Sequence, residues 1–566
     1  MSDAVDNGPI QVNVAVHLRR AAESRPFKRA VVCPSGRDRC GRVTYAHLTF
    51  QQLDRESDRL AHGLQCAGIG RGVRTILMVR PGLEFFELIF AIFKIGAVPV
   101  VVDPGMGIQR MLTCFRSTRP QAFVGVPRAH AVRTLFPQYF KTVAAWVTVG
   151  RRWFWGGHSL EKLRGDGWKP FEMARTARDD VAAILFTTGS TGPAKGAVYT
   201  HGNFDAQLRQ IGAHLDFGAD EVDLSTFPLF ALFYPALGIT AVVPEMDPTR
   251  PARANPARIV EAILDQGVTN LFASPALLER VGAYGRSHGL QLAPLKRVIS
   301  AGAPVQARTL ERFAPMLPAE TDIHTPYGAT EAVPITSIRA SEILAETRAL
   351  TDKGYGICVG RPIHDISVAI IAVSDDPIPR WKEELVAPQG EIGEIVVKGP
   401  LVSRSYFENP AADALAKISD RDGIWHRMGD LGWIDRKGRI WFCGRKSHRV
   451  ITAAETLYTI PCESIFNTHP LVLRSALVGI GPKDRQVPVI CIEPTESKGR
   501  IHRNALRAEL LDLAASHELT RNIRIVLFHS AFPVDIRHNA KIFRERLAAW
   551  AARRVKRAAL ERTEGA

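Results

Sequence analysis

The sequence lacks the features that mark several specialised classes of protein. Its 566 residues include eight cysteines with no C-x-x-C pair and no regular framework, which argues against a disulfide scaffold and fits a reducing compartment. No apolar run reaches the roughly 20 residues that cross a bilayer. The run from Leu88 to Phe93, for example, meets Lys94, and the start Met1-Ser2-Asp3 carries no basic and apolar leader. We therefore expect a cytoplasmic protein without a transmembrane segment.

The chain is also poor in concentrated charge. Its net charge of +16 and pI of about 9.7 would suit an anionic partner, but the basic residues are mostly scattered. The densest group runs from Arg553 to Arg557, with no nucleic-acid-binding motif beside it. We expect a solvated helix face there and no nucleic-acid partner, which leaves an acidic lipid surface or an acidic protein partner open.

What the chain does contain is material for a large α/β protein. Hydrophobic residues make up 46% and charged residues 23%, as in ordinary globular proteins. Since single cores stop growing beyond about 250–300 residues, at least two domains are expected. From Thr75 to Val79 the pattern predicts a strand, from Leu83 to Ile95 a helix, and from Val98 to Val102 a second strand, which together indicate a βαβ unit and a parallel sheet.

Other segments continue this alternation. The spacing predicts helices over residues 14–22, 111–117 and 276–288, and a longer helix that opens at Thr44 and ends before Gly68. Strands are predicted over residues 122–126, 143–149, 270–273, 297–300 and 393–399. The polar stretch 151–178 indicates a surface connection.

A loop rich in glycine and hydroxyl groups follows the apolar strand Val181 to Phe186. Its glycines let backbone N–H groups approach an anion, its hydroxyls add donors, and a lysine offsets phosphate charge. A plain surface loop is the alternative, but this loop lies between two apolar strands. It is not a Walker A motif, because no hydroxyl follows its lysine. The predicted phosphate-binding residues are Thr187, Thr188, Gly189, Ser190, Thr191, Gly192 and Lys195.

This loop resembles the signature of the adenylate-forming superfamily, which includes acyl-CoA synthetases, luciferases and peptide-synthetase adenylation domains. The stretch His324 to Glu331 resembles the superfamily's Y-G-x-T-E motif. Glu331 offers a carboxylate oxygen for Mg²⁺, Thr330 a donor to phosphate, and Tyr327 a ring face for adenine. Taken alone, this pentapeptide could be a strand-end turn. The resemblance further implies nucleotide contacts at Gly302, Ala303, Pro304 and Gly328.

Two later motifs complete the resemblance. Asp430, in a glycine-bounded turn, matches a family aspartate that accepts both ribose hydroxyls, and Arg445 matches an arginine that contacts the ribose. Lys541 matches the catalytic lysine, although Ala540 stands where the family usually has glycine. The alternative for Lys541 is an ordinary surface lysine. The resemblance implies a large N-terminal adenylate-forming domain over residues 1–445 and a small mobile C-terminal α+β domain over 446–566, with the hinge at Lys446.

The resemblance implies ATP- and Mg²⁺-dependent activation of a carboxylic acid to an acyl-adenylate, with Lys541, Glu331 and Thr330 as catalytic residues. Acyl-CoA synthetases usually carry a glycine shortly after the hinge, and residues 450–461 contain none. The sequences of segments 227–233, 327–334, 461–463 and 535–544 resemble those of the β-lactone synthetases of bacterial long-chain olefin biosynthesis, in which the substrate's own β-hydroxyl attacks the adenylated carboxyl. That implies a long-chain 2-alkyl-3-hydroxy acid as substrate and lactone-processing enzymes as partners.

Alternatives remain open at this stage. An acyl-CoA synthetase or fatty acyl-AMP ligase would share all the activating residues, whereas a non-enzymatic nucleotide-binding regulator should lack Glu331 or Lys541, both of which are present. The aromatic, proline-broken segment 226–235 is either a core turn or the border of an acyl pocket.

Overall fold

A computed structural model describes residues 12–186, 194–227, 232–495, 502–534 and 542–563. Its N-terminal part is built on a sheet whose strands are parallel except for the final hairpin. In spatial order these strands are β7 (His158–Ser159), β6 (Ala145–Thr148), β5 (Ala122–Gly125), β3 (Arg74–Met78), β4 (Val98–Val102), β8 (Val181–Phe186) and β9 (Gly196–Thr200). The predicted βαβ unit is therefore confirmed, and the helix between its strands is α3 (Leu83–Lys94).

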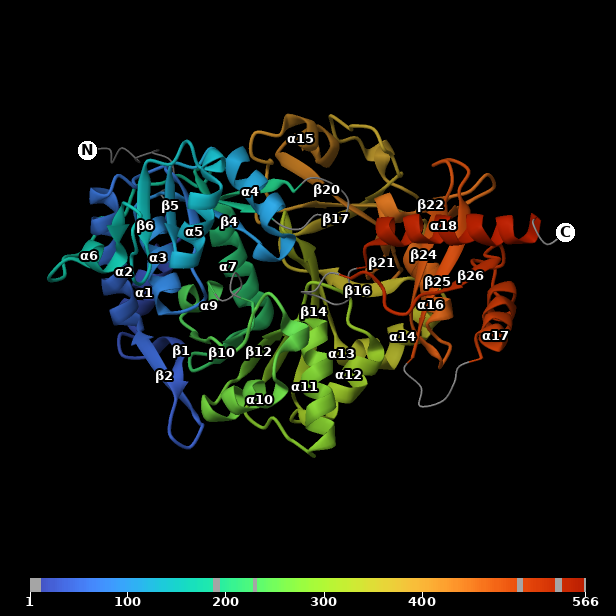
Figure 1. Cartoon of the computed structure of the whole chain (residues 1–566), viewed down its shortest axis with the longest axis horizontal. Coiled ribbons are helices and arrows are strands. Elements are labelled where there is room, and N and C mark those ends of the chain that lie inside the picture. The colour runs from blue at the N-terminus through green and yellow to red at the C-terminus, as the bar shows by residue number, and fades with distance from the viewer. Residues whose placement is uncertain (1–11, 187–193, 228–231, 496–501, 535–541, 564–566) are drawn as a thin grey trace, which may run out of the picture.

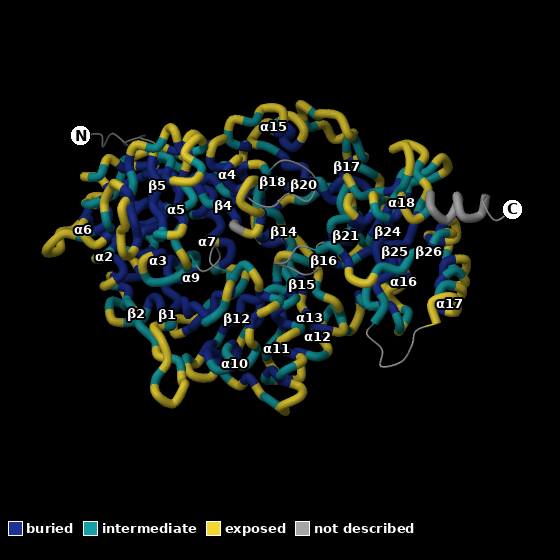
Figure 2. The backbone as a smooth tube through the Cα atoms, in the orientation of Figure 1, coloured by how far each residue is buried: buried dark blue, intermediate teal, exposed yellow. Residues whose placement is uncertain are grey.

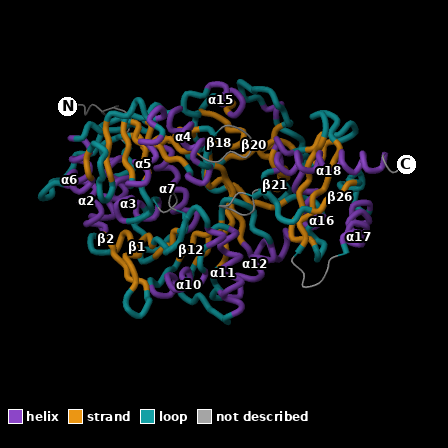
Figure 3. Tube along the Cα trace, in the orientation of Figure 1, coloured by secondary structure: helices purple, strands orange, loops and turns teal. Residues whose placement is uncertain are grey.

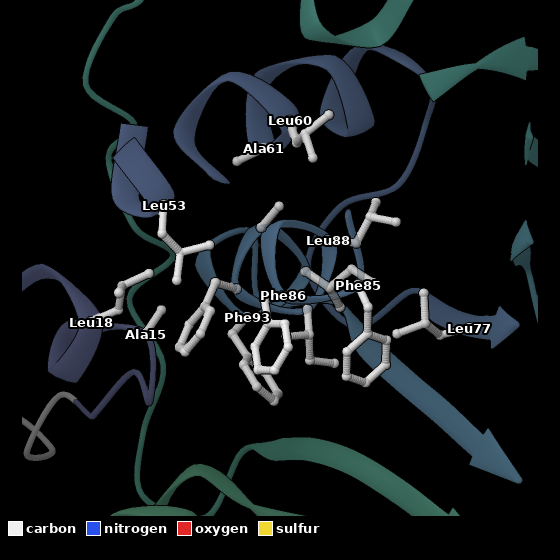
Figure 4. Close-up of a cluster of buried hydrophobic side chains, with 14 of the residues drawn as sticks. Ala15, Leu18, Leu53, Leu60, Ala61, Leu77, Phe85, Phe86, Leu88 and Phe93 are labelled. Atoms are coloured by element: carbon white, nitrogen blue, oxygen red, sulfur yellow. The ribbon is translucent and has the colours of Figure 1, made fainter. Parts of the chain in front are cut away.

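Helix α3 forms the centre of the largest hydrophobic core. Almost every side chain along it is buried, so it reads as an all-round apolar helix rather than an amphipathic one. Figure 4 shows α3 with Phe85, Phe86 and Phe93 beneath α2 (Phe50–Cys66), which contributes Leu53, Leu60 and Ala61. Helix α1 (Val16–Ser24) adds Leu18 to the same cluster.

The helix predicted to open at Thr44 is wrong over its first residues. Residues Val43–Thr49 form strand β2, which pairs antiparallel with β1 (Arg29–Arg37). Helix α2 begins at Phe50 because Thr49 caps it: the Thr49 hydroxyl accepts from the Gln52 backbone N–H, and the Gln52 side chain accepts from the Thr49 N–H. The capping signal was therefore assigned to the wrong threonine.

The predicted surface connection 151–178 is likewise only partly a connection. It holds β7 and the short helix α6 (Leu160–Arg164), whose Leu160 and Leu163 pack into the core. Helix α6 approaches α2 closely at Gly63, where an added Cβ would lie 2.0 Å from the Leu163 carbonyl oxygen.

A second, larger sheet occupies the middle of the chain. Its order runs β17 (Ser367–Ile371), β18 (Gly393–Lys398), β20 (Gly423–Ile434), β21 (Ile440–Arg445), β16 (Ile357–Pro362), β15 (Ala332–Arg339), β14 (Asp322–Ala329), β13 (Arg297–Ser300), β12 (Asn270–Ala273), β10 (Val222–Ser225), β11 (Thr240–Val242), β1 and β2, with β19 (Lys417–Asp420) beside β20. Strands β10 to β14 are parallel, and from β14 onward the pairing turns antiparallel. Figure 3 shows these strands as the orange bands between the purple helices.

Helices cover both sheets. They are α4 (Ile108–Ser117), α5 (Pro127–Leu135), α7 (His201–Leu215), α9 (Phe233–Ala236), α10 (Pro256–Asp265), α11 (Pro275–Ser287), α12 (Ala307–Phe313), α13 (Ala340–Glu342), α14 (Arg348–Asp352) and α15 (Pro410–Ala416). Thr200 caps the start of α7, since its hydroxyl accepts from the Asn203 N–H.

A separate C-terminal unit lies at the right of Figure 1. It contains the hairpin β22 (Val450–Ile451) and β23 (Thr456–Leu457), a sheet of β24 (Val472–Ile480), β25 (Val487–Pro494) and β26 (Ile525–Phe528), and helices α16 (Thr459–Phe466), α17 (Arg503–Ala515) and α18 (Arg544–Thr563). Figure 2 shows its own buried centre around β24 and β25. The α/β class with a large and a small part is confirmed, while a boundary at residue 445 and the mobility of the small part stay predictions.

Candidate active site

A large cavity of about 1430 Å³ lies among the described residues of both large sheets. Its lining has an apolar part, which includes Phe85, Phe90, Phe233, Val243 and Phe272, and a polar part, which includes Lys195, Glu331, Tyr406, His426 and Arg445. Phe227 and Leu232 of the aromatic segment also line it, so the geometry favours the acyl-pocket interpretation of residues 226–235 over the core turn. A cavity of this composition can hold an apolar chain and a charged group together.

Glu331 reaches the cavity from the turn between β14 and β15. Gly328 precedes the turn at a point where an added Cβ would lie 2.6 Å from the Ala332 carbonyl oxygen, so a side chain there would force the hairpin apart. Thr330 and Glu331 occupy the turn itself, and the Thr330 carbonyl accepts a hydrogen bond from the Tyr199 hydroxyl. The strand-end turn and the candidate metal ligand are therefore the same structure.

Tyr406 holds the Glu331 carboxylate. Its hydroxyl donates to Glu331 Oε1 at 2.7 Å. Burial, followed by the charge of Glu331, raises the pKa of Tyr406 far above its ordinary value, so the hydroxyl stays protonated as a donor. Tyr406 is positioned by an antiparallel β-bridge to Ala197 of β9, two residues after Lys195.

Two lysines face the ring of Tyr406. The Lys195 Nζ lies 5.0 Å from the ring centroid and the Lys417 Nζ lies 5.4 Å from it. Lys417 is buried, donates to the Ser403 carbonyl and lies 3.3 Å from the Ser403 hydroxyl. Burial lowers the pKa of Lys417 to about 8. Sequence reasoning missed Lys417 and Tyr406; the available signal was a lone lysine in the otherwise small and apolar stretch Ala414 to Ile418.

Asp430, Tyr327 and Arg445 form a second polar cluster. The Tyr327 hydroxyl donates to Asp430 Oδ2 at 2.6 Å, and Arg445 Nη1 lies 3.0 Å from Asp430 Oδ1. The charge of Asp430 raises the pKa of Arg445, which also donates to the Met428 carbonyl at 3.2 Å. Arg445 and Gly429 line the cavity, whereas Tyr327 and Asp430 pair in the wall beside it.

The remaining predicted residues divide into three groups. Gly328, Thr330, Lys195 and Gly302 line the cavity, and Gly302 adopts a φ of 95° directly after β13, where a side chain would be strained. Ala303 and Pro304 follow Gly302 at half-buried and exposed positions and do not belong to the lining that the structure describes. Thr187 to Gly192 and Lys541 lie outside the described residues.

The cavity wall also joins the large and small parts. Asp375, which lines the cavity, accepts from Arg449 Nη2 at 2.8 Å and from Lys483 Nζ at 2.9 Å. These two hydrogen bonds, Arg449 first, lower the pKa of Asp375 to about 2. Lys446, at the predicted hinge, lies 3.1 Å from Glu394 Oε1. Cationic side chains beyond residue 445 are therefore tied to Glu394 of β18 and to Asp375 in the loop after β17.

The donor set bears on the expected metal. Among the described residues no three His, Cys, Asp or Glu side chains converge, so they provide no all-protein metal cage. Mg²⁺ typically takes one or two carboxylates and fills its other positions with phosphate oxygens and water. The carboxylate of Glu331, on a cavity that Lys195 also lines, fits that pattern. Within the described residues, no helix is both long and apolar enough to cross a membrane.

Comparisons with known proteins agree with this geometry. The family model described as AMP-binding enzyme matches residues 18–407. An olefin β-lactone synthetase of Xanthomonas campestris is 46% identical over 97% of this chain and 99% of its own, and one of Stenotrophomonas maltophilia is 47% identical over 95% and 98%.

Solved structures extend the likeness to the fold. The crystal structure of an anthranilate CoA ligase in complex with anthranoyl-AMP superposes with a TM-score of 0.79, at 20% identity and over 98% of this chain and 99% of that one. At this identity the likeness concerns the fold alone. The resemblance predicted from the motifs is thus confirmed over nearly the whole chain.

Proposed function

This chain belongs to the AMP-binding enzyme family, and from that premise we propose that it is an olefin β-lactone synthetase. It activates a long-chain 2-alkyl-3-hydroxy acid with ATP and closes the product to a β-lactone, releasing pyrophosphate and AMP. The observation that carries the proposal is the identity of 46–47% to two olefin β-lactone synthetases over nearly the full length of both chains. The cavity, with apolar and cationic parts, supports it.

Adenylation would use both parts of the cavity, the apolar part for the acid and the polar part for ATP. The acid's carboxylate attacks the α-phosphorus, a P–O bond forms, and pyrophosphate leaves with the electrons of the broken P–O bond. This step needs charge neutralisation and orientation more than covalent help from the protein. Lys195 and the loop Thr187 to Gly192 would bind the leaving phosphates, and Lys541 would bridge the two reactants. Asp430, supported by Tyr327 and Arg445, would accept the ribose hydroxyls.

Glu331 would hold Mg²⁺, which when bound supplies neutralisation of phosphate charge. The Tyr406 hydroxyl fixes one oxygen of Glu331 and thereby orients the other. Lys417 binds Ser403, which lies in the same segment as Tyr406. Ser403 and Lys417 would therefore influence Glu331 indirectly, through Tyr406.

Lactone closure needs no external acceptor. The substrate's β-hydroxyl oxygen attacks the acyl carbon, loses its proton, and AMP leaves with the carboxyl oxygen that was bound to phosphorus. Holding nucleophile and electrophile in one molecule is worth about 7–11 kcal/mol of the barrier, against which ring strain acts. The absence of glycine from residues 450–461 agrees with an enzyme that does not require CoA.

The same proposal implies a cellular compartment and functional partners. The eight cysteines are all free, which fits work in the reducing cytoplasm. Enzymes that consume a β-lactone would be the functional partners, because the strained ring is a reactive product.

A product assay tests the proposal. The chain is incubated with ATP, Mg²⁺ and a long-chain 2-alkyl-3-hydroxy acid, with and without CoA, beside the matching acid that lacks the hydroxyl. We expect β-lactone and AMP from the hydroxy acid in both conditions. The hydroxyl-free acid should release pyrophosphate but give no lactone, and CoA should not rescue it. Acyl-CoA formed from either acid at the rate of adenylation would make the chain an acyl-CoA ligase instead.

A further inference from the structure

One stretch of the chain contains no acidic residue at all. Residues 104–160 hold no Asp or Glu but eight basic residues, which equals half of the net charge of +16. These are Arg110, Arg116, Arg119, Arg128, Arg133, Lys141, Arg151 and Arg152. The stretch forms helices α4 and α5 and strands β5 and β6, which lie together on one side of the molecule in Figure 1. Charge that is scattered over the rest of the chain is therefore of one sign here.

Large apolar side chains are exposed within the same stretch. Phe154 is 84% exposed, Leu135 73% and Trp153 55%, and the neighbouring Arg151 and Arg152 are exposed as well. We call residues 151–154 the aromatic–basic patch. Adjacent exposed aromatic residues are unfavourable in water and mark a surface that meets something else.

The loop that carries the patch is anchored from behind. Trp155 is buried, stacks on His130 of α5 at a centroid distance of 5.4 Å, and donates from Nε1 to the Thr148 hydroxyl at 3.1 Å. Arg133 of α5 lies over the ring of Trp146 at 3.7 Å and donates to the Gly156 carbonyl at 3.4 Å. Because Trp155 holds the loop inward, Trp153 and Phe154 are presented outward.

Helix α5 connects the patch with the cavity. Its residues Arg128, Ala129 and Val132 line the cavity, while His130 and Arg133 hold the patch loop. One helix thus separates the aromatic–basic patch from the place where an apolar chain would be bound.

We propose that the aromatic–basic patch docks the protein on the surface of an anionic phospholipid membrane. Trp and Phe insert at the headgroup level, where an apolar ring can leave water, and arginines beside them are attracted to anionic lipids. A purely acidic polymer would pair with the arginines but would leave Trp153 and Phe154 in water, so a lipid surface fits the patch better. Docking places the wall of the cavity beside the membrane, from which a long-chain apolar acid would be drawn. The proposal concerns binding alone and holds whichever acceptor the enzyme uses.

Vesicle co-sedimentation of the full chain tests the proposal. The parent is mixed with vesicles of phosphatidylcholine alone or of phosphatidylcholine with phosphatidylglycerol. The test variants are Trp153→Ala/Phe154→Ala and Arg151→Glu/Arg152→Glu. The matched controls are Phe27→Ala, which removes a ring that is 82% exposed, and Arg39→Glu/Arg436→Glu, which makes the same charge change at exposed positions elsewhere.

We expect the parent to bind the phosphatidylglycerol vesicles, and more weakly as salt is added. Each double variant of the patch should bind at least about tenfold more weakly than the parent, since each arginine near an anionic surface and each inserted ring contributes to the affinity. Both controls should bind as the parent does. Pyrophosphate release with a detergent-dispersed acid and the melting temperature should be unchanged in all variants, which excludes misfolding as the cause.

Two results would overturn the proposal. One is a parent that does not bind phosphatidylglycerol vesicles, or an aromatic double variant that binds them like the parent. The other is binding to polyglutamate that matches binding to vesicles and does not depend on Trp153 and Phe154, which would make the patch a docking surface for an acidic protein.

Discussion

Two buried lysines of this protein have very different surroundings. Lys94, at the end of α3, lies 2.6 Å from Asp54 Oδ1 and 2.7 Å from Asp58 Oδ1, and Arg19 also pairs with Asp58. Lys417, beside the polar part of the cavity, is held by the carbonyl and hydroxyl of Ser403, and no carboxylate forms an ion pair with it among the residues that the structure describes. The charge of Lys94 is neutralised by direct ion pairs inside the fold, whereas the charge of Lys417 is offset by Glu331 and Asp413 only at longer range.

The difference separates a structural charge from a functional one. A buried cation without a direct ion pair tends to destabilise a protein, so such a cation marks a place where its charge can serve a bound ligand. The polar part of the cavity is where phosphate groups of ATP would bind. We therefore expect the loss of Lys94 to damage the fold, and the loss of Lys417 to damage the reaction while leaving the fold intact.

The largest effect should follow from Lys94→Met. This change leaves Arg19 as the one cation that the structure still pairs with the buried carboxylates of Asp54 and Asp58, and removing one member of such a group typically costs about 3–5 kcal/mol. Chemical denaturation should reveal the loss in the free energy of unfolding. The folded fraction should keep the parent's KM for ATP. A variant as stable as the parent would mean that the acids are neutralised without Lys94.

Lys541→Ala tests a second lysine with a proposed role in the reaction, this one in the small C-terminal part of the chain. If Lys541 acts where carboxylate meets α-phosphate, its loss should lower the rate of pyrophosphate release by about 10²–10³-fold, the effect of removing one preorganised charge contact in a transition state. ATP binding should survive, since it rests on the large part of the chain. Arg553→Ala, an exposed cation on α18, is the matched control and should be silent. Unchanged release in Lys541→Ala would refute the assignment.

Glu331→Gln tests the acid that the neighbouring cations surround. The amide keeps the shape but removes the charge a Mg²⁺ site requires, so activity should fall by about 10²-fold and recover partly at high Mg²⁺. Direct titration of Mg²⁺ with ATP bound should show a weaker affinity. Glu320→Gln, at an exposed position, should match the parent. Equal Mg²⁺ dependence in Glu331→Gln and the parent would place the metal elsewhere.

Lys417→Met gives the sharpest contrast with Lys94→Met and the smallest effect. If Lys417 supports Glu331 through Ser403 and Tyr406, kcat/KM should fall by about tenfold, the lower range for a residue that supports a metal ligand. Its melting temperature should equal or exceed the parent's, since a desolvated charge disappears. Lys417→Arg should restore part of the activity. A clear drop in melting temperature with normal activity would make Lys417 a structural residue like Lys94.

The pH dependence of stability offers a second reading of Lys417. Its pKa in the folded protein is about 8, against an ordinary value of 10.5. Below pH 8 both states hold the proton, and between the two values only the unfolded chain does, so the parent's stability rises with pH across that window. The difference in unfolding free energy between Lys417→Met and the parent should therefore shrink as pH rises from about 8 to 10.

Much of the site could be predicted because its chemistry is local in the sequence. Glu331 and Gly302 lie in short turns at strand ends, Arg445 matches an arginine of the family, and the structure brings all three to one cavity. Lys417 and Tyr406 could not be found in this way. The hydrogen bond from Tyr406 to Glu331 depends on the pairing of residue 406 with β9, which comes from a distant part of the chain, and Lys417 reaches this place only through Ser403.

The fold shows the same division. The unit from β3 to β4 follows from alternating apolar runs, and its predicted ends differ from the observed ones by a residue at most. Strands β1 and β2 were missed because β2 is half-exposed along its length, so its alternation is weak and the nearby helix signal dominated. That strand exists because β1 continues the large sheet and offers it an edge.

Isotope labelling tests the central claim, adenylation of the carboxyl followed by attack of the substrate's own hydroxyl, most directly. The hydroxy acid is prepared with ¹⁸O in both carboxyl oxygens and converted without CoA, and AMP and lactone are examined by mass spectrometry. The account predicts one ¹⁸O in AMP and one in the lactone carbonyl, with the ring oxygen unlabelled. Unlabelled AMP together with a lactone that retains both ¹⁸O atoms would contradict it, because ATP would then have activated the hydroxyl instead of the carboxyl.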